Sequence, residues 1–357
     1  MRATPILYGT AKHGGVMFGQ AGPVQSQVQN LVATAGAQQA QGRPAGALAT
    51  LQQALATAQA GGPALVGQVM VAIATLRAAT GDNGEAASAM QQAAQFFGQA
   101  GDGPSEIRAQ IELASLLASS GQADNAMGLL QRCLTAASQL GGNQLVAEVH
   151  GAVGQLLLGM EQPQAAAQEF RTALDLATGL PSPLVAIQLR VFLAIAVFKS
   201  GDVSGANSLL AENARRARGI PDPTMSAMGL GAVSDALRVI QRPLDALTVG
   251  QEVVAKLRHA GAQPQLVQAT LALADICAQV GRPAEFAQHK SEALVGANQL
   301  GGPATVASAL MQLGMMAMQR GDQIAAGDLL GQARAQAVAA GVPQPLALTQ
   351  TLGQLGL

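Results

Sequence analysis

The sequence predicts an all-α fold in which helical hairpins repeat along the chain. A 40-residue period supports this, because prolines recur at that spacing at Pro23, Pro63, Pro183, Pro223, Pro303 and Pro343. A second series lies between them at the same spacing and consists of Gly81, Gly121, Glu161, Gly201, Gln241, Gly281 and Gly321. A fixed period of about 20 to 50 residues is typical of repeat arrays, in which each unit packs against its neighbours.

The unit from Ala307 to Gly341 shows how each period folds. Its first apolar stripe has the i, i+3, i+4, i+7 spacing of one helix face and consists of Leu310, Leu313, Gly314 and Ala317. Gly321 then ends this helix, because glycine suits the left-handed position that follows a helix C-terminus. A second helical stripe follows on Ala326, Leu330 and Ala333. Each unit is therefore predicted to be a helical hairpin with a tight turn.

Three positions, counted from the turn residue, hold similar side chains in successive units, and we call each such set of equivalent residues a column. The fifth position is small: Ala47, Ala86, Ala126, Ala166, Ala206, Ala246 and Ala326, with Phe286 as the exception. The ninth is mostly large and apolar: Leu51, Met90, Leu130, Phe170, Leu210 and Leu330, with Gly250 and Lys290 departing. The twelfth is mostly small: Ala54, Ala93, Cys133, Ala173, Asn213, Val253, Ala293 and Ala333. Alanine allows helix axes to approach to about 8 Å, so we expect the small columns where helices cross.

The columns predict eight antiparallel hairpins over residues 23–340, preceded by an N-terminal tail at 1–22. An apolar helix at 341–357 is expected to cap the last hairpin. The tail lacks the apolar segment of a signal peptide, and no run approaches the roughly 18 apolar residues of a membrane span. We therefore expect a cytoplasmic protein.

Composition argues against several classes of function. The formal net charge is −1 and only 11% of residues are charged, so nucleic acid and acidic membranes are not expected partners. No His or Cys pair has metal-ligand spacing, and no phosphate-binding glycine motif or nucleophile–base cluster occurs. Cys133 and Cys277 fall in different repeats at core positions, which predicts two buried thiols without a disulfide. We expect no cofactor, no metal and no enzymatic activity.

The pattern L-G-x6-G-D-x3-A-x3-L-x2-A at Leu313–Ala333 resembles the tetratricopeptide repeat. The resemblance covers about nine-tenths of the chain, with a period of 40 residues instead of 34. Long-period variants resemble the sensor arrays of bacterial transcription regulators and the arrays of kinesin light chains. The resemblance implies an α-solenoid that winds as a right-handed superhelix, with a concave face lined by the first helix of each pair.

The family register also implies which residues line the concave face and meet a partner. They are Gln68, Val71, Thr75, Arg108, Ile111, Ser115, Glu148, Gln155, Gln188, Ile195, Phe198, Met228, Asp235, Arg238, Gln268, Asp275, Ser308, Met311 and Met315. This set is mostly neutral and lacks the Lys and Asn clamp with which chaperone-binding members hold a peptide carboxylate.

The residues favour a non-enzymatic scaffold or adaptor that binds another protein or peptide, through an apolar or uncharged polar segment. Two alternatives stay open: a ligand- or peptide-sensing regulatory array, and a self-assembling structural component such as a homo-oligomer or part of a larger complex. The stripe of Met311, Met315 and Met318, with Met316 beside it, also fits two interpretations, either an adaptable binding surface or filling of the core.

Overall fold

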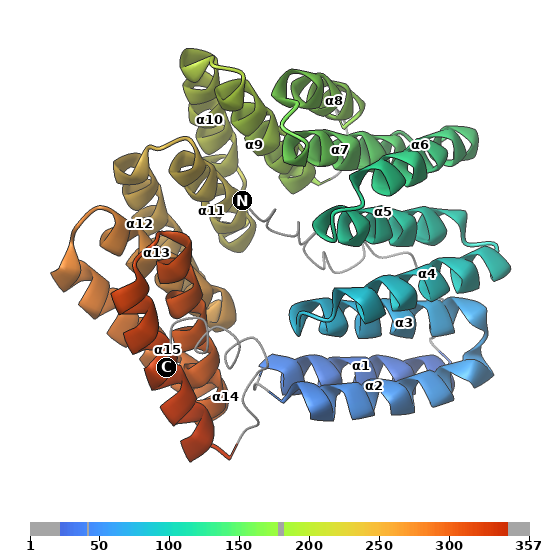
Figure 1. Cartoon of the computed structure of the whole chain (residues 1–357), viewed down its shortest axis with the longest axis horizontal. Helices are drawn as coiled ribbons and strands as arrows, with labels where there is room; N and C mark the ends of the chain where they lie inside the picture. The colour runs from blue at the N-terminus through green and yellow to red at the C-terminus, as the bar shows by residue number, and fades with distance from the viewer. Residues whose placement is uncertain (1–21, 41–42, 178–181, 342–357) are drawn as a thin grey trace. The chain divides into compact units, whose positions relative to one another are not determined.

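The computed structural model describes residues 22–40, 43–177 and 182–341, and all regular structure within these ranges is helical. Fifteen α-helices and one short 3₁₀ helix, η1 (Gln59–Gly61), follow one another (Figure 1). Among these helices none is long and apolar enough to cross a membrane. Apart from residues 22 and 341, the predicted tail at 1–22 and the predicted capping helix at 341–357 lie outside the described residues.

The first helices of the repeats begin at the predicted 40-residue spacing. They are α1 (Pro23–Ala40), α3 (Pro63–Ala79), α5 (Gly103–Ser119), α7 (Asn143–Gly159), α9 (Pro183–Lys199), α11 (Pro223–Val239) and α13 (Gln263–Gln279). The second helices are α2 (Pro44–Ala58), α4 (Asn83–Gln99), α6 (Ala123–Leu140), α8 (Pro163–Leu176), α10 (Val203–Arg218), α12 (Pro243–Ala260) and α15 (Gln323–Ala339). The all-α solenoid predicted from the sequence is confirmed.

Helix α14 (Pro283–Gln319) contains two repeat helices that follow without a loop. Gly301 and Gly302 leave helical geometry in its middle, with φ of −161° and 68°, and Pro303 then begins the second segment. The first segment is the second helix of the seventh repeat, and the other is the first helix of the eighth. Pro303 thus keeps the position that the proline series predicted.

The helices group into two compact units, which we describe separately. Unit 1 contains α1 to α7 and unit 2 contains α8 to α15. Within unit 1, α3 packs on α4 and α5 on α6, and α4 packs on α5 to join the two pairs. Within unit 2, the pairs α9–α10, α11–α12, α13–α14 and α14–α15 are packed in the same manner.

The Gly-Asp dipeptide at many turns ends one helix and begins the next. In the turn after α3, the amide of Gly81 donates to the carbonyl of Ala78 at 3.0 Å, and the amide of Asp82 donates to that of Arg77 at 2.9 Å. Gly81 has the positive φ of 85° that this C-terminal motif requires. The Asp82 carboxylate then accepts a hydrogen bond from the amide of Glu85 and caps α4. The same aspartate cap occurs at Asp102, Asp202, Asp222 and Asp322.

Apart from the half-buried Phe286 and Lys290, the three predicted columns are core positions, as the repeat register requires. Every alanine of the fifth column is fully buried, and every member of the twelfth column is buried, including Cys133 and the polar Asn213. The Asn213 side-chain amide donates to the carbonyl of Ile187 on the paired helix at 2.9 Å. The ninth-column residues Leu130, Phe170, Leu210 and Leu330 are among the most completely buried large side chains.

Small residues on the first helices face these columns. A Cβ atom added to Gly314 would lie 2.7 Å from the Leu330 side chain, so this helix crossing has no room for even a methyl group. At the equivalent crossing of α11 and α12, the Ser234 hydroxyl donates to the carbonyl of Ala246 at 2.9 Å. Small side chains therefore set the separation of the paired helices.

Among the turns that the structure describes, two have a residue other than glycine at the left-handed position, and one of them gives a stability prediction. Gln241 has a φ of 62°, where other turns have glycine. We expect Gln241→Gly to raise the free energy of unfolding by roughly 0.5–1 kcal/mol in urea titrations. The left-handed conformation costs a side chain about 1–2 kcal/mol, which the greater unfolded-state entropy of glycine offsets in part.

The matched control is Gly281→Gln, since Gly281 holds the same turn position with a φ of 73°. This change should lower stability by a similar amount. A Gln241→Gly protein that is less stable than the wild type would contradict the assignment of backbone strain to this turn.

Candidate functional site

The candidate site is the surface that the first helices present, which we call the first-helix surface and define by the partner-contacting residues predicted above. All of them lie on first helices, including the second segment of α14. The exposed members are Gln68, Thr75, Arg108 and Ser115 in unit 1, and Met228, Asp235, Gln268 and Met315 in unit 2. The half-buried members are Val71, Glu148 and Gln155 in unit 1, and Gln188, Ile195, Phe198, Arg238, Ser308 and Met311 in unit 2.

Ile111 and Asp275 are buried and offer a partner no accessible surface. Ile111 packs in the core formed with α6 and α7. Asp275 is 1% exposed and is covered by arginine side chains from neighbouring helices. Whether the remaining residues meet a partner stays a prediction.

In unit 1, one ion pair joins two successive first helices across a full repeat. The Arg108 guanidinium on α5 donates to the two Glu148 carboxylate oxygens on α7, with N–O distances of 2.8 and 3.3 Å. The Gln144 side chain donates a further hydrogen bond to Glu148 at 3.0 Å. The charges of Arg108 and Glu148 are therefore balanced within the protein.

Glu112, one helical turn after Arg108 on α5, differs from its neighbours. Its side chain is half-buried and has no hydrogen bond or ion pair within the described residues. Burial raises the pKa of this carboxyl from 4.5 to about 7. The equivalent positions of α3 and α7 hold Ala72 and Ala152, so the carboxyl stands alone in its column.

The raised pKa of Glu112 predicts how stability depends on pH. Because the folded-state pKa lies above the ordinary value, folding favours the protonated form of Glu112. Its contribution is fully present below about pH 4.5 and is lost as the pH rises to about 7. The stability of Glu112→Gln relative to wild type should therefore increase by on the order of 2 kcal/mol across this window.

Urea unfolding of both proteins at several pH values measures this difference. The comparison cancels the groups that titrate equally in both proteins. A stability difference that stays constant from pH 4 to 8 would contradict an unusual environment for Glu112.

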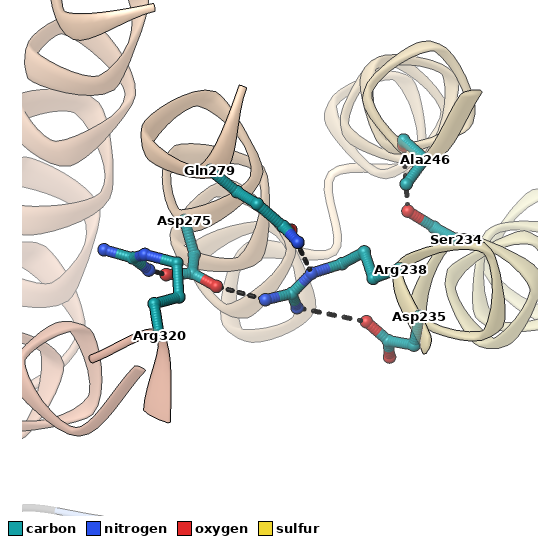
Figure 2. A network of polar contacts seen from close by, with 7 residues as sticks. All are labelled: Ser234, Asp235, Arg238, Ala246, Asp275, Gln279 and Arg320. Atoms are coloured by element: carbon teal, nitrogen blue, oxygen red, sulfur yellow. Dashed lines mark hydrogen bonds and ion pairs between the residues drawn. The ribbon is translucent and has the colours of Figure 1, made fainter. Parts of the chain in front are cut away.

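In unit 2, a larger polar cluster joins three first helices, as Figure 2 shows. The Arg238 guanidinium on α11 and that of Arg320, at the end of α14, both contact the buried Asp275 carboxylate on α13. Arg238 also donates to the Gln279 side chain at 3.4 Å and lies 3.8 Å from the exposed Asp235 carboxylate. Arg238 and Arg320 stand near helix C-termini, where a cation is favourably placed against the helix dipole.

Burial governs the electrostatics of this cluster. The Arg238 and Arg320 side chains are only 24% and 18% exposed. Burial lowers the pKa of Arg238, and the nearby Asp235 opposes that change. Burial also lowers the pKa of Arg320, Asp322 opposes it, and the positive charge of Arg238 lowers it further. The Asp275 carboxylate thus offsets the energetic cost of burying these two cations.

Removal of the Asp275 charge should therefore destabilise the protein. We expect Asp275→Asn to lower the free energy of unfolding by roughly 3 kcal/mol, since breaking a buried pair leaves uncompensated charge. Asp235→Asn is the matched control, because the Asp235 side chain is 67% exposed and its change should stay within about 0.5 kcal/mol. Equal effects of the two changes in urea titrations would contradict the conclusion that Asp275 compensates the charges of the two arginines.

Two further ion pairs join successive second helices in unit 2. Arg218 at the end of α10 donates to the Glu252 carboxylate on α12 at 2.9–3.2 Å. Arg258, one repeat later, pairs in the same way with Glu292 on α14. All four side chains are substantially exposed, so these pairs contribute little to stability.

The methionines at the end of the array belong largely to the core. Met311, Met316 and Met318 pack against the buried cluster of α13, α14 and α15. Met315 is the exposed member of the group, with 38% of its surface accessible. This placement supports core filling for most of the stripe and leaves Met315 as its outward-facing side chain.

The described residues hold no group of three or more His, Cys, Asp and Glu side chains that could hold a metal ion. Cys133 and Cys277 are buried free thiols, as predicted. The Cys133 thiol donates to the Gln110 side chain at 3.2 Å, and burial raises its pKa to about 11. This thiol is therefore poorly suited to nucleophilic chemistry.

The sequence-based prediction missed Glu112, Gln279 and Arg320. A column comparison could have indicated Glu112, since it is the sole acidic residue in a column that includes Ala72, Ala152, Ala232 and Ala272. Arg320 directly precedes a turn glycine, where other repeats have Thr80, Ser120 or Ser200. Its contact with Asp275 depends on the packing of α13 against α14, which no local pattern encodes.

Comparison with known proteins gives a family match for part of the sequence and a solved structure with a similar fold. Residues 105–179 match the family model described as tetratricopeptide repeat. The fold is similar to the crystal structure of yeast Tom70, with a TM-score of 0.58 and 12% sequence identity over 96% of this chain and 65% of that chain. At this identity the likeness shows the fold alone.

Two other solved structures have TM-scores below 0.5, so no conclusion about this chain is drawn from them. BtubC from P. vanneervenii is 21% identical, with a TM-score of 0.48 over 54% of this chain and 80% of that chain. A Rap protein complexed with Competence and Sporulation Factor is 13% identical, with a TM-score of 0.46 over 93% and 97%. A search of curated protein sequences found no significant match.

Proposed function

We propose that this chain, of which residues 105–179 match the tetratricopeptide repeat model, is a non-enzymatic scaffold or adaptor that binds a segment of another protein on its first-helix surface. The observation that carries the proposal is that the two arginines of that surface are paired within the protein. Arg108 is satisfied by Glu148, and Arg238 by Asp275. A partner would have to break these pairs in order to use their charges.

The remaining groups of the surface define the partner. The exposed Gln68, Thr75, Ser115 and Gln268 offer amides and hydroxyls that can hydrogen-bond to the backbone of an extended chain. Met228 and Met315 add exposed, polarizable apolar surface. These groups fit a mostly uncharged segment with polar and apolar side chains. A cytoplasmic location and the absence of a cofactor are parts of the same proposal.

Substitutions on exposed positions of α3 and α5 test this function. Thr75→Arg combined with Ser115→Arg should reduce partner recovery about tenfold in affinity purification from the native cell, because added bulk and charge displace the segment. Melting should be unchanged, since both side chains are exposed.

The control places the same substitutions on second helices, as Gln92→Arg with Gln131→Arg, both of which are exposed. Partner recovery should then equal that of the wild type. The proposal fails if the wild-type protein recovers no partner, or if both double variants bind equally well.

Self-assembly is a second candidate, favoured by exposed aliphatic side chains in unit 2. Ile324 is 82% exposed, Val338 63% and Leu244 61%. Light scattering over a range of concentrations decides between the two candidates. A molar mass that stays at the monomer value would eliminate self-assembly, whereas growth of the mass that Ile324→Glu abolishes would support it.

A further inference from the structure

A half-buried carboxyl group without a partner among the described residues distinguishes the first helices of unit 1. Helices α3, α5 and α7 contain three acidic residues, Glu106, Glu112 and Glu148. Glu106 accepts a hydrogen bond from the Gln110 side chain at 3.1 Å, and Glu148 is paired with Arg108. Glu112 has neither a hydrogen bond nor an ion pair within the described residues, although it is half-buried.

The position of Glu112 relates it to the first-helix surface. On α5 it stands one turn after Arg108 and about one turn before Ser115, both of which are exposed. Residues spaced by three or four share one helix face, so Arg108, Glu112 and Ser115 belong to the same face of α5. The equivalent residues of the neighbouring first helices, Ala72 and Ala152, carry no polar group that could satisfy the carboxylate.

We propose that Glu112 binds a cationic side chain, a guanidinium or an ammonium, that the partner segment carries within its otherwise uncharged sequence. This inference rests on the proposed function, because it assigns one contact of the same surface. Among otherwise uncharged segments, Glu112 would then favour those that carry an Arg or Lys at the matching position.

Charge complementarity is the argument for a cation. A half-buried carboxylate without a protein partner bears part of the cost of desolvation, and a charge-assisted hydrogen bond from a guanidinium or ammonium offsets that cost. Burial is the cause of the raised pKa of Glu112, so an incoming cation would meet a carboxyl group that no other charge compensates. Groups whose pKa is shifted by burial are concentrated at functional sites.

Arg108, on the same face of α5, could itself pair with Glu112, but its guanidinium is engaged by another residue. A residue four positions earlier on a helix is within reach of Glu112. The two hydrogen bonds to Glu148, at 2.8 and 3.3 Å, engage the Arg108 guanidinium instead. Glu148 on α7 is thus a positioning residue, because it holds the Arg108 guanidinium and leaves Glu112 available.

The test uses the full-length chain with ¹³C-labelled glutamate and two small probes. N-acetyl-arginine amide carries the cation, and N-acetyl-citrulline amide is its neutral isostere. The Glu112 side-chain carboxyl resonance is assigned by its loss in Glu112→Gln. We expect the arginine probe to lower the pKa of Glu112 towards its ordinary range and the citrulline probe to leave it unchanged. Binding of the arginine probe should be about tenfold weaker in Glu112→Gln.

Glu148→Gln is the second variant and reports on Arg108 as a competitor. It frees Arg108, which should then pair with Glu112 and lower its pKa without any probe, while the arginine probe binds more weakly. Equal responses of Glu112 to the arginine and citrulline probes would overturn the inference, as would undiminished arginine binding in Glu112→Gln.

Partner capture separates this inference from the proposed function. If the wild type recovers a partner from the native cell and Glu112→Gln recovers it equally well, the inference fails and the proposed function stands. If the wild type recovers no partner, the proposed function itself fails.

Discussion

Each repeat requires its two helices to lie close together, and small side chains make this possible. The hydrogen bond from the Ser234 hydroxyl to the carbonyl of Ala246 shows how near α11 and α12 approach. At Gly314 the contact with Leu330 is tighter still, because not even a Cβ atom would fit. Since the large ninth-column side chains fill the space beside these crossings, the size of the small residues decides where every neighbouring side chain can pack. This explains why alanine recurs in the fifth column while the exposed positions vary freely.

Once the helices are spaced in this way, successive first helices lie within reach of each other's long side chains. The pairs Arg108–Glu148 and Arg238–Asp275 both use this proximity, and both neutralise charge on the surface that a partner would meet. In a chain with only 11% charged residues, such pairing leaves recognition mainly to amides, hydroxyls and apolar groups, with Glu112 as the charged exception. Binding on such a surface depends on shape and on backbone hydrogen bonds more than on long-range attraction, so its specificity must come from a few distinctive side chains.

The repeat period and the turn residues made the hairpins, their boundaries and their core columns predictable from sequence. These features are local, because helix ends and apolar stripes depend on residues within a few positions of one another. The satisfied and unsatisfied charges were not predictable. Asp275 and Glu112 are both acidic residues on first helices, yet one is covered by two arginines from other repeats and the other has no partner in the described residues. Which of the two situations arises depends on side-chain positions about 40 residues apart, and no local pattern records them.

The contrast between these two carboxylates bears on what the first helices do. A carboxylate as deeply buried as Asp275 can stay charged only because Arg238 and Arg320 accompany it, so this group serves the packing of α11, α13 and α14 and is unavailable to a partner. Glu112 shows the opposite arrangement, since it bears the energetic cost of partial burial with no internal compensation. A group that only supported the fold could be replaced by alanine, as it is at Ala72 and Ala152, and the repeat would pack as well. The presence of a carboxyl group at this one position is therefore better explained by recognition than by stability.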